Sequence, residues 1–178
     1  TWAVQTAEAL LSETATQGRA MELARDLALK EVYARVAAFV IPPAGEPKEL
    51  QSLAIDACVA MDAAQIAPVM ATMLPNPQEE LPLRQKCALT LGRINNEESH
   101  QALLDNLKIA PEPVAIAIAT ALAGNAASGE KLLTAVVDGK ASARLLQDRN
   151  VANVLINAKV NNAQARIAEL TAKLPPQD

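Results

Sequence analysis

Apolar residues recur at helical spacing along most of the chain. Between residues 18 and 40 they form one stripe of a predicted helix, at Met21, Ala24, Ala28, Val32, Val36 and Phe39. Charged residues occupy its other faces, and the pairs Asp26–Lys30 and Glu31–Arg35 have the spacing and order that support an exposed helical face. A shorter helix is predicted before it, from about residue 2 to residue 14.

Prolines divide the chain, and the segments between them repeat. Because proline ends helices, it marks joints between helical units, at 42–43, 75 and 77, 111 and 113, and 175–176. An offset of 31 residues brings Ala60, Leu91 and Leu122 into register. Each unit has a first helix, a polar turn and a second helix; the turns are Asp62, Asn95–Asn96 and Asn125, and the second helices carry Val69–Met70, Leu103–Leu104 and Leu132–Leu133. Such helix-turn-helix units of about thirty residues are typical of an α-solenoid.

Small residues in the first helices predict close helix stacking, because helices approach closely only where side chains are small. They are Ala57, Ala60, Ala88, Gly92, Ala119 and Ala123. One segment, residues 114–119, alternates like a strand. We predict a helix there, because its neighbours in the repeat are helical and no second strand is visible to pair with it.

The C-terminal region has its own helix signals. Gly139 predicts a turn, and Ser142 predicts the N-cap of a helical stretch running to about residue 157. Asn161 and Gln164 predict a capping box for a last helix, which stops at Pro175.

Composition supports an all-α fold. Hydrophobic residues make up 51% of the 178 residues and aromatic residues only 2%, so alanine and leucine, both strong helix formers, supply the apolar mass. We expect a single repeat domain over 1–178, with capping helices over 1–46, three units over 47–138 and capping helices over 139–178.

The net charge and the hydropathy of the chain argue against nucleic acid and membrane as partners. The net charge is −4, so no overall positive field would attract nucleic acid. No uninterrupted apolar run approaches the ~20 residues of a membrane span, and direct membrane insertion is not expected. The chain begins at Thr1 without a signal-peptide pattern, which indicates a processed or excised segment of a longer protein.

Residue types that carry chemistry are scarce, and each has a structural interpretation. Cys58 and Cys87 lie singly in apolar helical runs, which favours buried free thiols, although a disulfide that would indicate an oxidising compartment stays open. His100, among polar neighbours, is expected on the surface. The other candidates are expected to be core methionines (Met61, Met70, Met73) and solvated carboxylates (Glu79, Glu80, Glu97, Glu98). No catalytic residue, metal ligand or cofactor site is predicted.

The candidate interaction surface consists of polar residues on the second helices and near the C-terminus. The first group is Gln65, Gln101, Asp105, Lys108, Glu130 and Lys131. The second group is Arg144, Gln147, Asp148 and Arg149, for which two interpretations are equally open: a buried bridge that holds the last helices, or a docking patch for the next domain.

One segment resembles a HEAT-type, armadillo-like repeat. In residues 83–104, Arg84 opens a first helix, Ala88 to Gly92 supply a small-Leu-Gly ending, and a polar turn at Asn95–Asn96 leads into a second helix. Leu53 and Ala115 stand at the position of Arg84 in the neighbouring units, so the polar ladder of longer HEAT arrays is largely missing. The resemblance covers about residues 47–138 and implies the fold only.

The C-terminal part is similar to a narrower family. Residues 139–148, 165–171 and the end at Leu174–Pro175–Pro176 resemble the segment that closes the HEAT-like region of large exported proteins of planctomycetes and related bacteria, described as membrane-bound dehydrogenase-like or haem-binding. In that family the helical region lies between a propeller-like domain and a c-type cytochrome domain. The resemblance implies a helical spacer from such a protein, periplasmic or exported. This chain has no Cys-x-x-Cys-His motif, so no covalently attached haem is expected in it.

The sequence therefore predicts a non-catalytic scaffold or spacer that contacts a protein or an adjoining domain of the same chain. The alternative is a HEAT-fold enzyme or ligand-binding protein, as among DNA glycosylases or bilin lyases of that architecture, with a small-molecule pocket between helices. A glycosylase would need a basic groove and aromatic side chains. This acidic chain has three aromatic residues, Trp2, Tyr33 and Phe39.

Overall fold

Helices joined by short turns make up the structure, a computed structural model that describes residues 1–43 and 48–175. No β-strand occurs within those residues, which confirms the all-α prediction for them. The segment 114–119 that alternates like a strand lies in helix α7 (Glu112–Ala123), as predicted. Proximity of Cα atoms divides the chain into two units, Thr1–Pro68 and Val69–Asp178.

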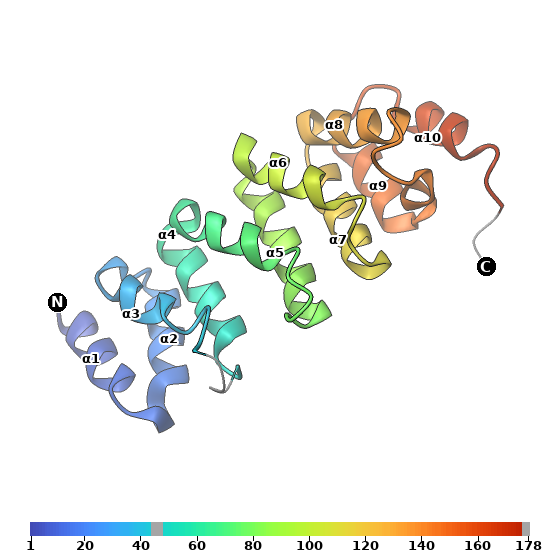
Figure 1. The fold of residues 1–178 in the computed structure, drawn as a ribbon. Coiled ribbons are helices and arrows are strands. Elements are labelled where there is room, and N and C mark those ends of the chain that lie inside the picture. The colour runs from blue at the N-terminus through green and yellow to red at the C-terminus, as the bar shows by residue number, and fades with distance from the viewer. Residues whose placement is uncertain (44–47, 176–178) are drawn as a thin grey trace. The chain divides into compact units, whose positions relative to one another are not determined.

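The first unit is built on two short helices that pack together (Figure 1). Helix α1 (Trp2–Leu11) packs on α2 (Gln17–Asp26), and the core between them includes Ala7, Leu11 and Met21. Three further elements complete the N-terminal region: the 3₁₀ helices η1 (Thr14–Thr16) and η2 (Lys30–Val32), and helix α3 (Tyr33–Ala37).

The single helix predicted over residues 18–40 is interrupted. Helix α2 ends at Asp26, and Ala28 takes the left-handed conformation at φ 47°. The amide of Leu29 donates to the carbonyl of Ala24, and Leu29 itself is buried. These are the features of a Schellman-type helix end, where an apolar residue after the turn packs back on the helix. Of the predicted stripe, Met21, Ala24, Val32 and Val36 are buried as expected, Phe39 is half-buried and Ala28 is exposed.

All four residues of the pairs Asp26–Lys30 and Glu31–Arg35 are exposed, as predicted, but neither pair forms an ion pair within the described residues. Asp26 pairs with its neighbour Arg25 at 2.8 Å, and Lys30 lies 4.0 Å from Asp62. Arg35 instead donates to the carbonyl oxygen of Glu8 at 3.0 Å, near the C-terminal end of α1. A cation there compensates the partial negative charge of the helix end.

Helix α4 (Gln51–Met73) is broken at a polar residue. Asp62 has non-helical torsion angles, φ −160° and ψ 92°, and its carboxylate accepts a hydrogen bond from the amide of Gln65 at 3.1 Å. It therefore caps a second helix, as the predicted turn requires. By length and composition alone α4 could cross a membrane, with 23 residues and a mean hydropathy of 1.5 in its most apolar window, 44% of which is buried.

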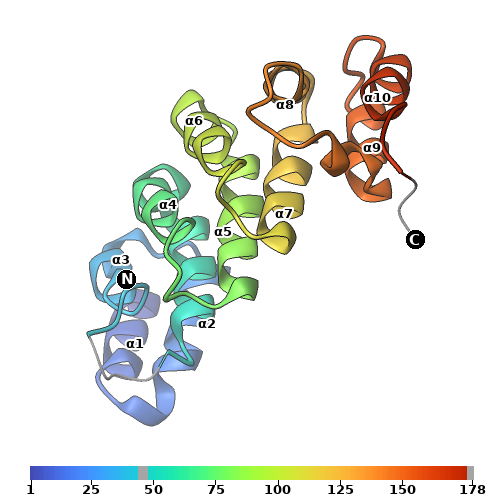
Figure 2. The same cartoon turned by 45° about the vertical axis from the view of Figure 1, so that its right-hand side comes forward.

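The second unit consists of consecutive helix pairs in two rows (Figure 2). In one row α5 (Leu81–Ile94) packs on α7 (Glu112–Ala123), and α7 packs on α9 (Arg149–Asn157). In the other row α6 (Glu97–Asn106) packs on α8 (Ala126–Val137), and α8 packs on α10 (Ala163–Thr171). The 3₁₀ helix η3 (Ala143–Gln147) contacts α7, α9 and α10.

Helices α5 and α7 approach each other at a glycine. A Cβ atom placed on Gly92 would lie 2.6 Å from the Cβ of Ala121 and 2.9 Å from its carbonyl oxygen. Real Cβ atoms do not come that close, so only glycine fits. The predicted role of small residues in stacking is confirmed here, and Ala57, Ala88, Ala119 and Ala123 are buried as well.

The pattern of buried residues supports the predicted offset of 31 residues between α5 and α7 but corrects the predicted offset between α4 and α5. The five buried residues of α5 fall, at an offset of 31, on five buried residues of α7, and Leu91 matches Leu122. At the same offset Leu91 would match Ala60, which is exposed. Cys58, 33 residues before Leu91, is buried, so the first offset is two residues longer than predicted. The turn between α4 and α5, residues 74–80, is longer than the turn between α6 and α7, residues 107–111, and this accounts for the difference.

Of the C-terminal helical elements, η3 begins where expected, whereas α9 and α10 begin at other residues. Ser142 caps as predicted, accepting from the amide of Arg144, and Gly139 forms the predicted turn with φ 71°. The helical stretch after it is divided at Asp148, whose carboxylate accepts from the amide of Val151 at 3.1 Å and opens α9. The predicted capping box of Asn161 is wrong: the N-cap of α10 is Asn162, at φ 50° and without a side-chain cap bond.

Candidate functional site

The residues predicted for an interaction surface lie in both units. Gln65 is exposed in the first unit. In the second unit Gln101 and Asp105 are exposed on α6 and hydrogen-bonded to each other at 2.6 Å, and Lys108 is exposed beyond the end of α6. Three of these side chains, Gln101, Asp105 and Lys108, therefore share one helix and its end.

The other two predicted residues on the second helices link neighbouring helices. Lys131 of α8 contacts Glu97 of α6 at 2.6 Å, and Glu130 of α8 contacts Arg166 of α10 at 2.6 Å. Each pair lowers the pKa of its carboxyl group, chiefly through the hydrogen bond from the cation. The two pairs form a ladder along α6, α8 and α10, so Glu130 and Lys131 are only half-exposed.

His100 is buried, which corrects the expectation of a surface histidine. Only 6% of the residue is exposed, and its Nε2 atom lies 2.8 Å from the Oδ1 atom of Asn95. The amide of Asn125 also donates to Asn95 Oδ1, so Asn95 links the imidazole to the turn of the next helix pair. Its Nδ1 atom has no hydrogen-bond partner within the described residues.

Burial also changes the titration of His100. The pKa of His100 is lowered, first because burial disfavours the charged imidazolium and second because Lys131 is nearby, while Glu97 opposes the shift. The neutral ring donates from Nε2 to Asn95 and keeps Nδ1 as an unprotonated acceptor.

A comparison between the two helix pairs α5–α6 and α7–α8 could have predicted that this histidine is buried. Asn96 and Asn125 are both N-caps, and each accepts from the amide of a serine three residues later, Ser99 at 2.8 Å and Ser128 at 3.0 Å. Both serines are buried. The residue after each serine, His100 or Gly129, is buried too, so alignment on the caps places His100 on the inner face.

The four predicted C-terminal residues act separately. Gln147 donates to the carbonyl of Pro175 at 2.9 Å and ties the end of the described chain to η3. Asp148 caps α9, and Arg144 and Arg149 are exposed. Within residues 1–43 and 48–175 no ion pair joins these arginines to Asp148, so the buried bridge is not formed there.

A small cavity in the second unit brings three predicted residues together. It has a volume of about 300 Å³ and lies between the end of α6, the first turns of α7 and η3. Lys108, Arg144 and Asp148 line it together with Glu112, and its apolar wall is formed by Leu107, Ala110, Ala115, Ile116 and Leu145. The arrangement combines a short apolar wall with charged groups of both signs.

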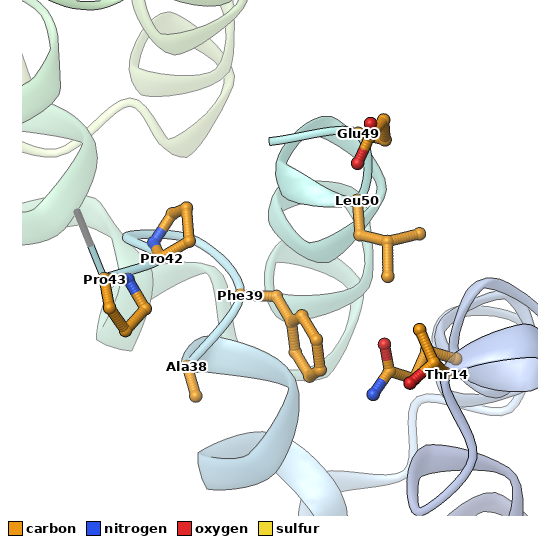
Figure 3. Close-up of a pocket in the computed structure, with 8 residues that line it drawn as sticks. Thr14, Ala38, Phe39, Pro42, Pro43, Glu49 and Leu50 are labelled. Atoms are coloured by element: carbon orange, nitrogen blue, oxygen red, sulfur yellow. The ribbon is translucent and has the colours of Figure 1, made fainter. Parts of the chain in front are cut away.

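The first unit contains a larger cavity of about 600 Å³ (Figure 3). Its walls are mostly apolar, and Phe39 lies in it with Pro42 and Pro43 on one side and Leu50 on the other. Glu49 supplies the only charged side chain among its described lining residues. Residue patterns did not predict this cavity, because segments distant in the sequence form it.

Sulfur-containing residues belong to the core. Cys58 and Cys87 are buried and free, as predicted, and burial raises the pKa of each thiol to about 12. Met61, Met70 and Met73 are buried, which confirms their predicted packing role. No group of three His, Cys, Asp or Glu side chains that could hold a metal ion occurs in the described residues.

Comparison with protein-family models, with curated proteins and with solved structures finds no significant match to this chain.

Proposed function

We propose that the chain is a non-catalytic helical-repeat module in which α5 to α10 form successive HEAT-like pairs of an α-solenoid. The packing of α5, α7 and α9 in one row and of α6, α8 and α10 in the other supports this arrangement. So do the equivalent caps of Asn96 and Asn125. In a solenoid each repeat contacts its neighbours only.

The module acts by presenting the exposed polar face of its second helices to a partner protein or to an adjoining domain of the same chain. The single observation that carries this function is the exposed polar face around Gln101, Asp105 and Lys108, beside a ladder of ion pairs that holds the helices of this row together. Exposed side chains on a rigid helical row are the usual working surface of repeat proteins.

Site-specific photocrosslinking tests this function. A photoreactive phenylalanine analogue replaces Asp105 in the protein expressed in the cells that make it, and a matched variant carries it at Leu89, exposed on α5 in the other row. We expect a discrete crosslinked protein, or a crosslink to another domain of the same chain, from position 105 and none from position 89. Equal crosslinking from both positions, or none from position 105, would refute the proposal.

The protein is also proposed to be a spacer segment of a larger exported redox protein, as the C-terminal resemblance implies. This chain itself carries no Cys-x-x-Cys-His motif, so any haem belongs to another part of the parent. The absorption spectrum of the full-length parent, purified from its source, tests the context: a c-type haem band supports it, and a haem-free parent contradicts it.

Ligand binding is a second candidate function, favoured by the cavity in the first unit. Its volume of about 600 Å³ lies within the range of small-molecule pockets, roughly 300–1,000 Å³, and its lining is mostly apolar. A thermal-shift screen against small apolar amines would test it, because Glu49 offers a carboxylate to a cation. Stabilisation must disappear in Leu50→Glu and persist in Leu27→Glu, a matched change at an exposed residue outside the cavity.

A further inference from the structure

We propose that the cavity between α6, α7 and η3 receives an apolar side chain from an acidic segment of the partner protein. This inference rests on the proposed function and specifies the chemistry of the partner. Two features of the cavity carry it: an apolar wall of a size to hold one side chain, and two cationic side chains, Lys108 and Arg144, that make no hydrogen bond or ion pair within the described residues.

The apolar wall is preformed. Leu107, Ala115 and Leu145 are each less than 9% exposed, and Ile116 is half-buried. The volume of about 300 Å³ stands at the lower end of the range for ligand pockets, roughly 300–1,000 Å³, so it suits one side chain better than a large organic molecule. A buried apolar anchor of this kind supplies much of the affinity in protein interfaces.

The negative charges around the wall are compensated within the protein, whereas the positive charges are less so. Asp148 already accepts hydrogen bonds from the amides of Asn150 and Val151 at the start of α9, and Glu112 lies in the first turn of α7. Both carboxylates are therefore compensated by the positive end of a helix. Within the described residues, the side chains of Lys108 and Arg144 make no hydrogen bond or ion pair, although Lys108 follows the end of α6, where helix carbonyls favour a cation.

Arg144 is consequently the main unsatisfied charge at the cavity. A guanidinium group binds a carboxylate through two parallel hydrogen bonds, which gives such a pair both strength and orientation. An aspartate or glutamate beside the inserted apolar side chain would make this contact, and a second acidic residue would meet Lys108.

The rim of the cavity favours a protein segment as the occupant. Ile109 lies between two lining residues, Lys108 and Ala110, and is 72% exposed. A molecule that only fills the cavity would leave this side chain in water, whereas a peptide chain crossing the rim would cover it. Exposed apolar residues beside a pocket are typical of protein-binding surfaces.

Fluorescence anisotropy with the full chain tests the inference. The probe is a fluorescein-labelled peptide of about ten residues in which leucine alternates with aspartate, used at low salt so that charge contacts are weakly screened. In one reference peptide lysine replaces aspartate, and in the other serine replaces leucine. We expect the leucine-aspartate peptide to bind at least about tenfold more tightly than either reference. Equal binding of the lysine peptide, or no binding of the acidic one, would overturn the inference.

Two matched variants locate the site. Arg144→Glu should weaken binding of the acidic peptide about tenfold or more, because it reverses the charge at the cavity. Arg149→Glu makes the same change of charge at an exposed arginine that does not line the cavity, and should alter binding less than about twofold. Equal losses in the two variants would show a general effect of charge and would refute the site. Circular dichroism of both variants confirms that the helices remain folded.

The outcome separates this inference from the proposed function. If the acidic peptide does not bind but position 105 still crosslinks to a partner, the inference fails and the proposed function stands. If the peptide binds through Arg144 and position 105 gives no crosslink, the cavity inference holds and the second-helix face is not the contact surface.

Discussion

Replacement of Gly92 by alanine tests the close contact between α5 and α7. In a helix interior this change normally stabilises by about 1 kcal/mol, because alanine loses less conformational entropy than glycine. Here the new Cβ atom would lie 2.6 Å from the Cβ of Ala121 and 2.9 Å from its carbonyl oxygen, whereas ordinary contacts begin at 3.4 Å. The atoms it meets belong to the backbone and to the Cβ of Ala121, which cannot rotate away.

The two helices must therefore separate by about 0.8 Å, the difference between 2.6 and 3.4 Å. Inserting a methyl group into such a tight contact costs about 1–3 kcal/mol, and separation also weakens the dispersion contacts along the α5–α7 interface. This cost outweighs the gain in helix propensity. We expect Gly92→Ala to lower the free energy of unfolding of the second unit by up to about 2 kcal/mol, which is the packing cost less the gain in helix propensity.

Gly18→Ala is the matched control. Gly18 also lies in a helix, α2, but its added Cβ would meet only the side chains of Leu50 and Leu53, at 3.6 and 3.9 Å, which are ordinary contacts. This variant should be stabilised by up to about 1 kcal/mol. Urea unfolding followed by far-ultraviolet circular dichroism measures both. If Gly92→Ala were stabilised like Gly18→Ala, the close approach of α5 and α7 would be refuted.

Three further predictions follow from the second unit. Because the pKa of His100 lies below its usual 6.5 in the folded protein, stability should be fully present above pH 6.5 and decline as the pH falls through the lower folded value. The urea midpoint measured against pH checks this, and an unchanged slope in His100→Gln would contradict it. Leu91→Asp buries an unpaired charge and should cost about 4 kcal/mol or more, whereas Leu89→Asp, on the exposed face of the same helix, should stay within about 1 kcal/mol; thermal melts that coincide would contradict the inward position of Leu91. Asn125→Ala removes a helix cap and should lower stability by about 1 kcal/mol, against little change for exposed Asn153→Ala; equal urea midpoints for the two variants would contradict the capping role.

Much of the candidate surface was visible in the sequence because it depends on local pattern. Gln101, Asp105 and Lys108 fall on the polar side of an amphipathic segment, and the structure leaves them exposed. The roles of Glu130 and Lys131 could not be predicted, because their partners, Arg166 and Glu97, are more than thirty residues away in the chain. The same holds for the two cavities, whose walls come from segments far apart in the sequence.

His100 shows where local context misleads. Its sequence neighbours are polar, which is typical of a surface site, but its side chain is buried and bonds to Asn95, which in turn accepts from Asn125. A helix has an inner and an outer face whatever the average polarity of the segment, and only the packing of the next helix pair makes one of them the inside.

The sequence by itself determined the helical class, the polar turn before each second helix and the small residues of the first helices. These features follow from the torsional preferences and hydrogen-bonding groups of neighbouring residues. Only the tertiary structure decided that the helix beginning near residue 18 ends before Ala28, that the first repeat offset is two residues longer, and that His100 is buried. Each of these depends on contacts between distant segments, whose packing energy exceeds the weak preference of any one residue for helix or for water.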